Sequence, residues 1–368
     1  MISKEKISRK KVKKISFKKT KNLLKNIKIL QNFEASNIWF LNKTINIDKI
    51  KINLKIKNDP YKKQVKRKYQ YWFYFKVNSI KDILIEYEIH NVNNYDNAWK
   101  GFQVCYSYDN INWNRTKTNI KIKKNKVDIS WKFKSDNNNV WFAYYPPYPY
   151  QKIKQTYKKY NTVGFSEQGR PILMKKIGSG KTKVWIISGQ HPGETINMWI
   201  LEGFLKRLKE KKSILKKYSF FIVPCLNPDG NVHGYWRLNS KGINLNRDWL
   251  AYKSKETQII KSQFLKYGFD LVIDLHGDEG SSHHFLAHST IQKHPLHDKI
   301  NRYLNKKNNN FQIENYYLQN NEEESFNNTL DELTFGITLE GAMKHKHDSY
   351  NTVQDEAIQI GIDLLNSI

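Results

Sequence analysis

The hydrophobic pattern of this 368-residue chain changes at a cluster of prolines, Pro146, Pro147 and Pro149. Before the cluster, short segments alternate apolar with polar or aromatic side chains, a pattern typical of antiparallel β-strands. After it, short apolar runs alternate with segments whose apolar residues recur at helical spacing. Because proline has no N–H to donate to a sheet, the cluster marks the end of one unit and a linker to the next. The pattern therefore predicts two domains of different class.

The first unit is expected to be an antiparallel β-sandwich over residues 29–150, because many short strands follow one another at short spacing. The strands expected there cover residues 45–57, 69–77, 83–90 and 140–145. Residues 1–28 precede it and hold twelve Lys and Arg against one acid, Glu5. We interpret them as a basic flexible tail rather than as part of the domain.

The second unit, over residues 151–368, alternates strands with helices and is expected to be an α/β/α sandwich around a mixed sheet. Its expected strands are residues 183–189, 220–226, 269–275 and 335–339, and its expected helices are 196–208, 256–267, 291–304 and a closing helix with Thr352 as N-cap. Residues 305–321 are rich in Asn and Lys and are expected to form a loop or lid. In this architecture ligands bind beyond the carboxyl ends of the strands.

Composition narrows the class of protein. Hydrophobic residues make up 39% and aromatics 14%, which excludes a wholly disordered chain. The cysteines, Cys105 and Cys225, exclude a disulfide framework and favour a reducing cytoplasm. No apolar run approaches the roughly 18 residues of a membrane span, and the basic start, interrupted by Lys25 and Lys28, is not expected to be a secretory signal.

The net charge is +29, and a surface of that sign attracts nucleic acid, acidic lipid or acidic peptide. Lysine, asparagine and isoleucine are, however, over-used along the whole chain. General compositional drift therefore explains the charge as well as a specific polyanionic partner does.

A metal site is predicted at the ends of two strands. His191 and Glu194 follow the strand over 183–189 at a spacing that lets both reach one ion, and His276 ends the strand over 269–275. Imidazole nitrogens and a carboxylate oxygen are the ligands of a catalytic zinc, which keeps one position open. Asp274 is expected to orient one of the imidazoles.

Further polar groups follow other strands. Asn246 and Arg247 form a pair able to grip a carboxylate, and Arg237 could stabilise an oxyanion. Glu340 ends the apolar strand over 335–339 beside a glycine, where burial would raise its pKa and suit it to proton transfer. Asn227-Pro228-Asp229-Gly230 has the local chemistry of a turn. Taken singly, each of these groups also fits an ordinary structural role.

The motifs HPGE, NPDG, NLNR and DLHG, followed by a strand-terminal glutamate, resemble in this order the zinc carboxypeptidase family of carboxypeptidase A. The region before them resembles the N-terminal domain of the cytosolic carboxypeptidase subfamily, with FEASN, YWFYF and FAYYPPY as the similar segments. The resemblance covers roughly residues 30–368. It implies one Zn²⁺ ion in a carboxypeptidase-like catalytic domain.

The resemblance also implies a role for each matching residue. His191, Glu194 and His276 would hold zinc, and Glu340 would be the general acid/base. Asn246 and Arg247 would bind the terminal carboxylate of the substrate, Arg237 would polarise the scissile carbonyl, and Asn227 and Asp229 would be mainly structural.

Two departures from the family concern substrate choice. The family has a tyrosine that closes over substrate, and Tyr316 and Tyr317 lie near the right distance without a motif that distinguishes them. The segment that would form the side-chain pocket is hard to align. His283, His284 and His288 follow the third ligand closely and are interpreted as pocket-lining or surface residues.

The leading hypothesis is a cytoplasmic zinc metallocarboxypeptidase, a hydrolase that cleaves the C-terminal peptide or glutamyl bond of protein or peptide substrates, acidic C-termini among them. The same zinc scaffold would also support an amidase acting on cell-wall (murein) peptides. A third alternative is a non-catalytic binding module whose basic surface holds nucleic acid, which the complete set of metal ligands and Glu340 disfavours. No membrane partner is expected, and the sequence does not predict an oligomeric state.

Overall fold

The computed structural model describes residues 26–46, 49–60, 70–78, 81–123, 126–288, 295–313, 316–317, 336–344 and 349–368. Residues 1–25 of the predicted basic tail lie outside this part of the chain, as does the end of the predicted loop over 305–321. Within the described residues, no helix is long and apolar enough to cross a membrane.

The N-terminal part contains two five-stranded sheets, with strand orders β1-β4-β10-β6-β7 and β2-β3-β5-β9-β8. Their bounds are β1 Lys28–Leu30, β2 Trp39–Asn46, β3 Lys49–Lys55, β4 Tyr74–Asn78, β5 Leu84–Val92, β6 Val104–Ser107, β7 Asn114–Thr116, β8 Asn119–Lys123, β9 Lys126–Lys134 and β10 Asn139–Ala143, with a short helix α2 Asp96–Trp99. The predicted sandwich is therefore present. Its strand pairs are antiparallel apart from β3 and β5, which run parallel.

One expected strand is in fact two. The predicted strand over 45–57 divides between β2 and β3, which pair with each other in antiparallel register. Apolar and polar residues alternate in β3 but not in β2, which begins Trp39-Phe40-Leu41. Within the predicted segment, two adjacent polar residues, Asp48 and Lys49, interrupt the alternation where the chain reverses, and the interpretation as one strand overlooked this.

The core between the two sheets is aromatic. Trp131 on β9 stacks on Tyr87 of β5 at a centroid distance of 5.2 Å, and its ring lies 5.3 Å from Phe142 on β10. All three side chains are fully buried. Large flat rings that pack in this way contribute both apolar burial and ring–ring attraction to the contact between the two sheets.

The C-terminal part is built on a mixed eight-stranded sheet of order β11-β12-β14-β13-β15-β18-β16-β17, as predicted. The strands are β11 Asn161–Phe165, β12 Pro171–Ile177, β13 Thr182–Ser188, β14 Tyr218–Val223, β15 Leu271–Asp278, β16 Phe285–His288, β17 Tyr316–Tyr317 and β18 Gly336–Ala342. β14, β13, β15 and β18 form a parallel centre, and β12 and β16 flank it in antiparallel direction.

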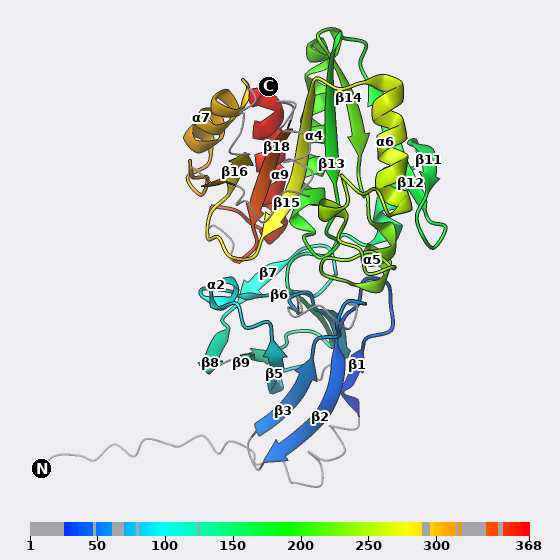
Figure 1. The fold of residues 1–368 in the computed structure, drawn as a ribbon. Coiled ribbons are helices and arrows are strands. Elements are labelled where there is room, and N and C mark those ends of the chain that lie inside the picture. The colour runs from blue at the N-terminus through cyan, green and yellow to red at the C-terminus, as the bar shows by residue number, and fades with distance from the viewer. Residues whose placement is uncertain are drawn as a thin grey trace, which may run out of the picture.

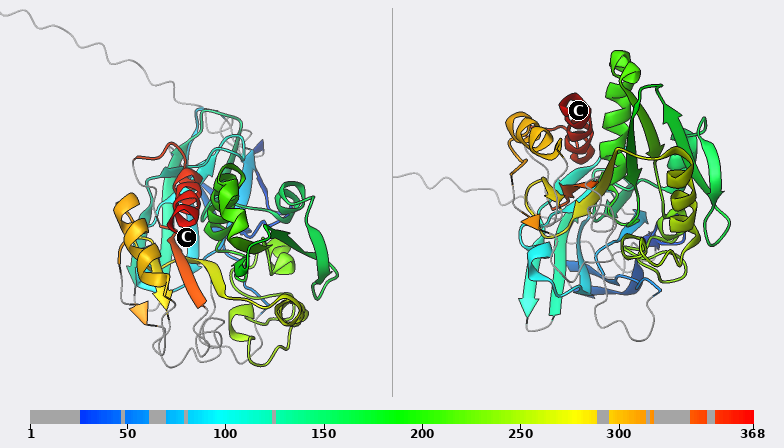
Figure 2. Two further views of the ribbon diagram at one scale, coloured as in Figure 1. Left: turned by 90° about the horizontal axis from the view of Figure 1, so that it is seen from above. Right: turned by 45° about the horizontal axis from the view of Figure 1, so that its top comes forward.

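Helices cover both faces of this sheet. They are α3 Tyr150–Thr156, α4 Ile196–Glu210, α5 Pro228–His233, α6 Lys255–Tyr267, α7 His297–Lys307 and α9 Val353–Ser367, with the 3-10 turns η1 Lys212–Lys216 and η2 Leu245–Arg247. Figure 2 shows α7, α9 and α4 side by side on one face and α6 on the other. The helix expected over 291–304 begins only at His297 and continues to Lys307, into the segment expected to be a loop. The predicted N-cap of α9 is confirmed, because Thr352 forms a capping box with Asp355.

The N-terminal domain lies against the end of the sheet to which β15 points (Figure 1). Residues of both domains belong to one buried apolar cluster. Arg115 crosses the boundary and donates to the carbonyl oxygens of Gln103, Tyr144 and, at 2.6 Å, Met343. The site at this end of the sheet is therefore enclosed by both domains.

Helices α4 and α9 approach closely because glycines face each other at their contact. A Cβ added to Gly203 would lie 1.9 Å from the carbonyl oxygen of Ile358, and one added to Gly361 would lie 1.8 Å from that of Ile200.

We expect Gly203→Ala to lower the free energy of unfolding by about 1–3 kcal/mol, because backbone atoms cannot move aside cheaply. Urea denaturation checks this. The exposed Lys209→Ala on the same helix is the control and should change stability by less than about 0.5 kcal/mol; equal effects of the two changes would contradict the packing argument.

Candidate active site

Three donor groups converge beyond the carboxyl ends of β13 and β15. Donor atoms of His191, Glu194 and His276 all lie within 4.8 Å of one another, and all three residues are buried. One carboxylate oxygen of Glu194 lies 2.8 Å from Nδ1 of His191, and the other lies 2.9 Å from Nδ1 of His276. The Nδ1 atoms and the carboxylate thus face a common point, and this donor set fits zinc.

The outer nitrogen of each imidazole has an oxygen acceptor. Nε2 of His191 lies 2.9 Å from Oδ1 of Asn244, and Nε2 of His276 lies 2.8 Å from Oδ2 of Asp274. Because both acceptors favour a proton on Nε2, the lone pair of the neutral ring is at Nδ1, where a metal would be held. Asp274 is thus the partner of His276, a choice that the sequence left open.

The charges in this group depend on one another. Burial and the neighbouring Arg237 lower the pKa of His191 to about 3. Burial also acts against a charge on His276, but Asp274 and Glu194 outweigh it and raise the pKa of that imidazole. For Glu194, burial alone would raise the pKa, yet the two histidines hold it below its usual range. The three side chains are therefore electrostatically coupled, and zinc binding would have to compete with protonation of the imidazoles.

Strand register brings Glu340 to this centre. β15 and β18 run parallel with His276 directly opposite Glu340. Paired residues on neighbouring strands point to the same side of a sheet, so Glu340 lies beside His276. Burial and the negative charges of Glu194, Asp278 and Asp274 raise the pKa of Glu340, although His276 opposes them. A carboxyl group with a raised pKa can accept and return a proton near neutral pH.

Glycines on the opposite side of the same two strands make room for helix α4. A Cβ on Gly277 would lie 2.5 Å from Cγ2 of Ile196, and one on Gly341 would lie 2.7 Å from Cδ1 of the same residue. The backbone N–H of Gly277 donates to Glu194 at 3.0 Å. Close approach of the strands to α4 thus also fixes the carboxylate.

The predicted substrate-binding residues lie around the same centre. Nη1 of Arg237 lies 3.8 Å from Oε1 of Glu194. Nδ2 of Asn246 lies 3.4 Å from Nε2 of His276, and Arg247 follows it in the short turn η2, with Nη1 donating to the carbonyl of Asn246 at 2.9 Å. The structure therefore brings the polar groups of three separate motifs together beyond the carboxyl ends of the parallel strands.

The NPDG turn holds the chain just before the metal-binding turn. Asn227 accepts from the N–H of Gly230 at 2.9 Å as N-cap of α5 and donates to the carbonyl of Gln190 at 3.1 Å. Asp229 is fully buried and accepts from Ser166 and Arg170, each at 2.7 Å. These contacts are structural, as expected for this motif.

Neither His283 nor His284 joins the three donors. His284 is buried between Glu356, 3.0 Å from its Nε2, and the N–H of Ala342, which donates to its Nδ1 at 2.9 Å. His283 is partly buried, and its Nδ1 lies 3.5 Å from Oγ of Ser282. The side chains of His288, Tyr316 and Tyr317 lie outside the described residues, so the substrate-closing tyrosine stays a prediction.

A second group of possible metal donors, Glu88, His90 and Asp128, lies in the N-terminal domain. Glu88 is ion-paired there with Lys51, and Nε2 of His90 lies 3.0 Å from Asn53. This group is less buried than the group around Glu194, and because a lysine balances its glutamate it has a structural explanation.

A carboxylate of the N-terminal domain supports the active site, although no sequence pattern pointed to it. Asp59 is 4% exposed and accepts the backbone N–H groups of Trp236, Arg237 and Leu238 at 2.8, 2.8 and 3.1 Å. The carbonyl of Trp236 in turn accepts from the N–H of Gly193, between the two ligands of the HPGE turn, at 3.0 Å. Asp59 thus fixes the segment that bears Arg237 and braces the metal-binding turn.

Burial raises the pKa of Asp59 to about 6, although the three N–H groups and Arg237 act against this. Its carboxylate is therefore held in place by hydrogen bonds at a cost in desolvation. The three hydrogen bonds give this carboxylate one orientation relative to the Arg237 segment.

We expect Asp59→Asn to reduce kcat by about 10- to 100-fold, because one acceptor oxygen becomes an NH2 group facing backbone donors and the Arg237 segment shifts. Hydrolysis of a C-terminal residue and zinc content, both measured well below the unfolding temperature, test this. The matched control is Asp109→Asn, which removes similar bonds to the N–H groups of Ile111 and Asn112 far from the site. Equal loss of kcat in the two variants would contradict the bracing role.

Comparison with known proteins agrees with this architecture. Residues 29–145 match the cytosolic carboxypeptidase N-terminal domain, and residues 150–345 match the zinc carboxypeptidase family. Cytosolic carboxypeptidase 2 of Mus musculus is 26% identical over 320 residues, which cover 73% of this chain and 36% of that protein. An uncharacterized protein of Zymomonas mobilis is 33% identical over 234 residues, covering 59% of this chain and 60% of its own length. The alignments thus span less than two thirds of these relatives.

Solved structures share the fold over almost the whole chain. A metallo-carboxypeptidase from Burkholderia cenocepacia superposes with a TM-score of 0.81 at 24% identity, covering 93% of this chain and 97% of that one. A metallo-carboxypeptidase from Pseudomonas aeruginosa, solved in complex with (2-guanidinoethylmercapto)succinic acid, has a TM-score of 0.78 at 25% identity and covers 92% of this chain and 97% of its own. With the family match spanning more than half of its residues, the chain belongs to the zinc carboxypeptidase family.

Proposed function

We propose that this protein is a zinc-dependent carboxypeptidase that hydrolyses the C-terminal peptide bond of protein or peptide substrates. The observation that supports this most is the convergence of His191, Glu194 and His276 on one point, with Glu340 paired in register with His276. The family match adds independent support, because the matched region contains these four residues.

In the proposed mechanism, His191, Glu194 and His276 hold one Zn²⁺ ion. When bound, the ion acts as a Lewis acid and lowers the pKa of water from about 16 to about 7. Glu340 takes a proton from the attacking water and returns it to the leaving amine. Its raised pKa, caused by burial and by neighbouring carboxylates, suits both transfers.

Three further residues would recognise the end of the substrate chain. Asn246 and Arg247 would bind the terminal carboxylate, since a guanidinium forks onto both oxygens while the amide adds a donor. Arg237 would stabilise the oxyanion that forms at the scissile carbonyl; removing such a donor typically reduces turnover about 100- to 1000-fold. An internal peptide offers no carboxylate at that position, so the enzyme would act only at a chain end.

We expect Glu340→Gln to retain zinc and to lose at least about 100-fold in kcat, because the amide keeps the shape but cannot accept the proton. Metal analysis and release of the C-terminal amino acid from a peptide check the two parts separately. Glu167→Gln, a glutamate outside the site, is the control. Turnover above a tenth of the unmodified protein's would refute the assigned role.

The release of the C-terminal amino acid, measured with and without a zinc chelator, also discriminates between the peptidase and the alternative functions. Activity that 1,10-phenanthroline abolishes supports a zinc peptidase, whereas a metal-free, inactive protein that shifts DNA would support the nucleic-acid-binding module. An amidase would instead release cell-wall peptides from murein, and the carboxypeptidases among the relatives favour the first function.

A cytoplasmic location is proposed together with the peptidase function. The free, buried state of Cys105 and Cys225 supports this location.

The preferred substrate is proposed to end in an acidic residue, because a protein of net charge +29 attracts acidic chains. We expect kcat/KM for a peptide ending in Glu to exceed that for matched peptides ending in Lys or Phe, and to fall as salt rises from about 50 to about 300 mM. Release of the last residue from the three peptides measures this. No preference for Glu would remove the acidic-substrate proposal while leaving the peptidase intact.

A further inference from the structure

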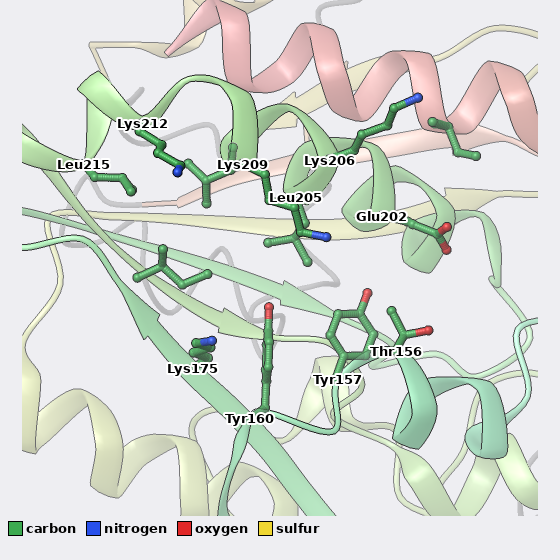
Figure 3. A pocket seen from close by; sticks show the side chains of 13 residues that line it. Thr156, Tyr157, Tyr160, Lys175, Glu202, Leu205, Lys206, Lys209, Lys212 and Leu215 are labelled. Carbon is green, nitrogen blue, oxygen red and sulfur yellow. The ribbon is translucent and has the colours of Figure 1, made fainter.

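A hollow of about 620 Å³ lies on the sheet face that bears α4, between that helix and the β11–β12 edge (Figure 3). It is lined by side chains of α3, β12, α4, η1 and α9 and of the segment that joins α3 to β11. None of the proposed zinc ligands or substrate-binding residues belongs to this lining. Its volume lies within the range of small-molecule binding sites, about 300–1,000 Å³.

One wall of the hollow is aliphatic. Ile177 comes from β12, Leu205 and Leu208 come from α4, Leu215 comes from η1 and Ile358 comes from α9. Apolar side chains on four elements thus border one space. Such a wall favours a ligand with an apolar body, since burying that body removes apolar surface from water.

Two tyrosines close the opposite side. Figure 3 shows the hydroxyl groups of Tyr157 and Tyr160 pointing across the hollow toward α4. Burial raises the pKa of both side chains, so the hydroxyls stay neutral and able to donate. A neutral donor beside an apolar wall suits an oxygen-bearing end of a ligand.

The charge around the hollow is positive and unbalanced. Glu202 already has partners, because the hydroxyl of Tyr148 donates to it at 3.0 Å and Nζ of Lys152 lies 3.6 Å away. Lys209 and Lys212 have no acidic partner among the described residues, and Nζ of Lys175 lies 5.6 Å from the centre of the Tyr160 ring. In Figure 3 the amino groups of Lys175 and Lys212 lie on opposite sides of the hollow. An anionic group placed between these lysines would have favourable contacts on both sides.

We propose that this hollow binds a free medium-chain carboxylate, with its alkyl body along the aliphatic wall and its carboxylate between Lys175, Lys209 and Lys212. The match is in both chemistry and size: an apolar space of limited volume excludes a folded partner, and the lysines select a negative end. The site is independent of the proposed peptidase chemistry, because the two share no residue.

The test is isothermal titration of the full-length protein with octanoate, decanoate and dodecanoate. We expect one site per chain, with affinity rising about tenfold for each two added carbons, as burial of CH2 groups requires. The variant Lys209→Gln/Lys212→Gln should weaken dodecanoate binding at least tenfold and leave peptide hydrolysis unchanged. Both lysines lie near the end of α4 or in η1 with exposed side chains, so this variant is expected to fold.

Controls separate the hollow from other carboxylate sites. Lys255→Gln, an exposed lysine on α6, should bind dodecanoate like the unmodified protein. Arg247→Ala should also bind it normally, which excludes the proposed substrate carboxylate site. The proposal would be overturned if dodecyltrimethylammonium bound as tightly as dodecanoate, or if the Lys209→Gln/Lys212→Gln variant bound dodecanoate like the unmodified protein. It would also be overturned if the protein bound an acidic peptide or anionic vesicles but not the free carboxylate.

Discussion

The active site depends on the lateral register of three parallel strands. β13 pairs with β15 so that Ser188 lies opposite Leu275, and β15 pairs with β18 so that His276 lies opposite Glu340. Because side chains alternate between the faces of a sheet, a slip of one residue between β15 and β18 would turn Glu340, the proposed acid/base, toward α4. The glycines Gly277 and Gly341 strengthen this register, since only glycine at these positions lets the buried Ile196 approach.

The N-terminal domain is part of the site rather than an independent attachment. Asp59 receives three backbone N–H groups from the segment around Arg237, and that segment accepts from Gly193 in the metal-binding turn. Aromatic packing continues across the same boundary, where the Tyr71 ring lies 4.9 Å from that of Trp236. The two domains therefore share a core, and moving one relative to the other would displace the arginine.

Much of this arrangement could be predicted from the sequence, for local reasons. His191 and Glu194 are three residues apart, so one turn brings them together, and His276 and Glu340 each end an apolar run.

What the sequence could not reveal depends on distant partners. Asp59 lies 177 residues before Trp236, and no periodicity links them. The reversal between β2 and β3 was missed although two adjacent polar residues, Asp48 and Lys49, interrupt the alternation there. Glu279 is a nearby acid that the sequence analysis did not consider, although it lies three residues after His276. Burial and the charge of Asp278 raise the pKa of Glu279 to about 7.

The balance of charge explains why so many acidic groups can share this site. Glu194, Asp274 and Asp278 all raise the pKa of Glu340, and burial adds to their effect. Such a concentration of carboxylates in a partly water-excluded space is unfavourable unless a cation offsets it. Arg237 supplies one positive charge, at 3.8 Å from Glu194. A divalent ion at the point where the three donors meet would supply further positive charge and stabilise the carboxylates around it. We therefore expect metal binding to be coupled to the stability of the surrounding fold.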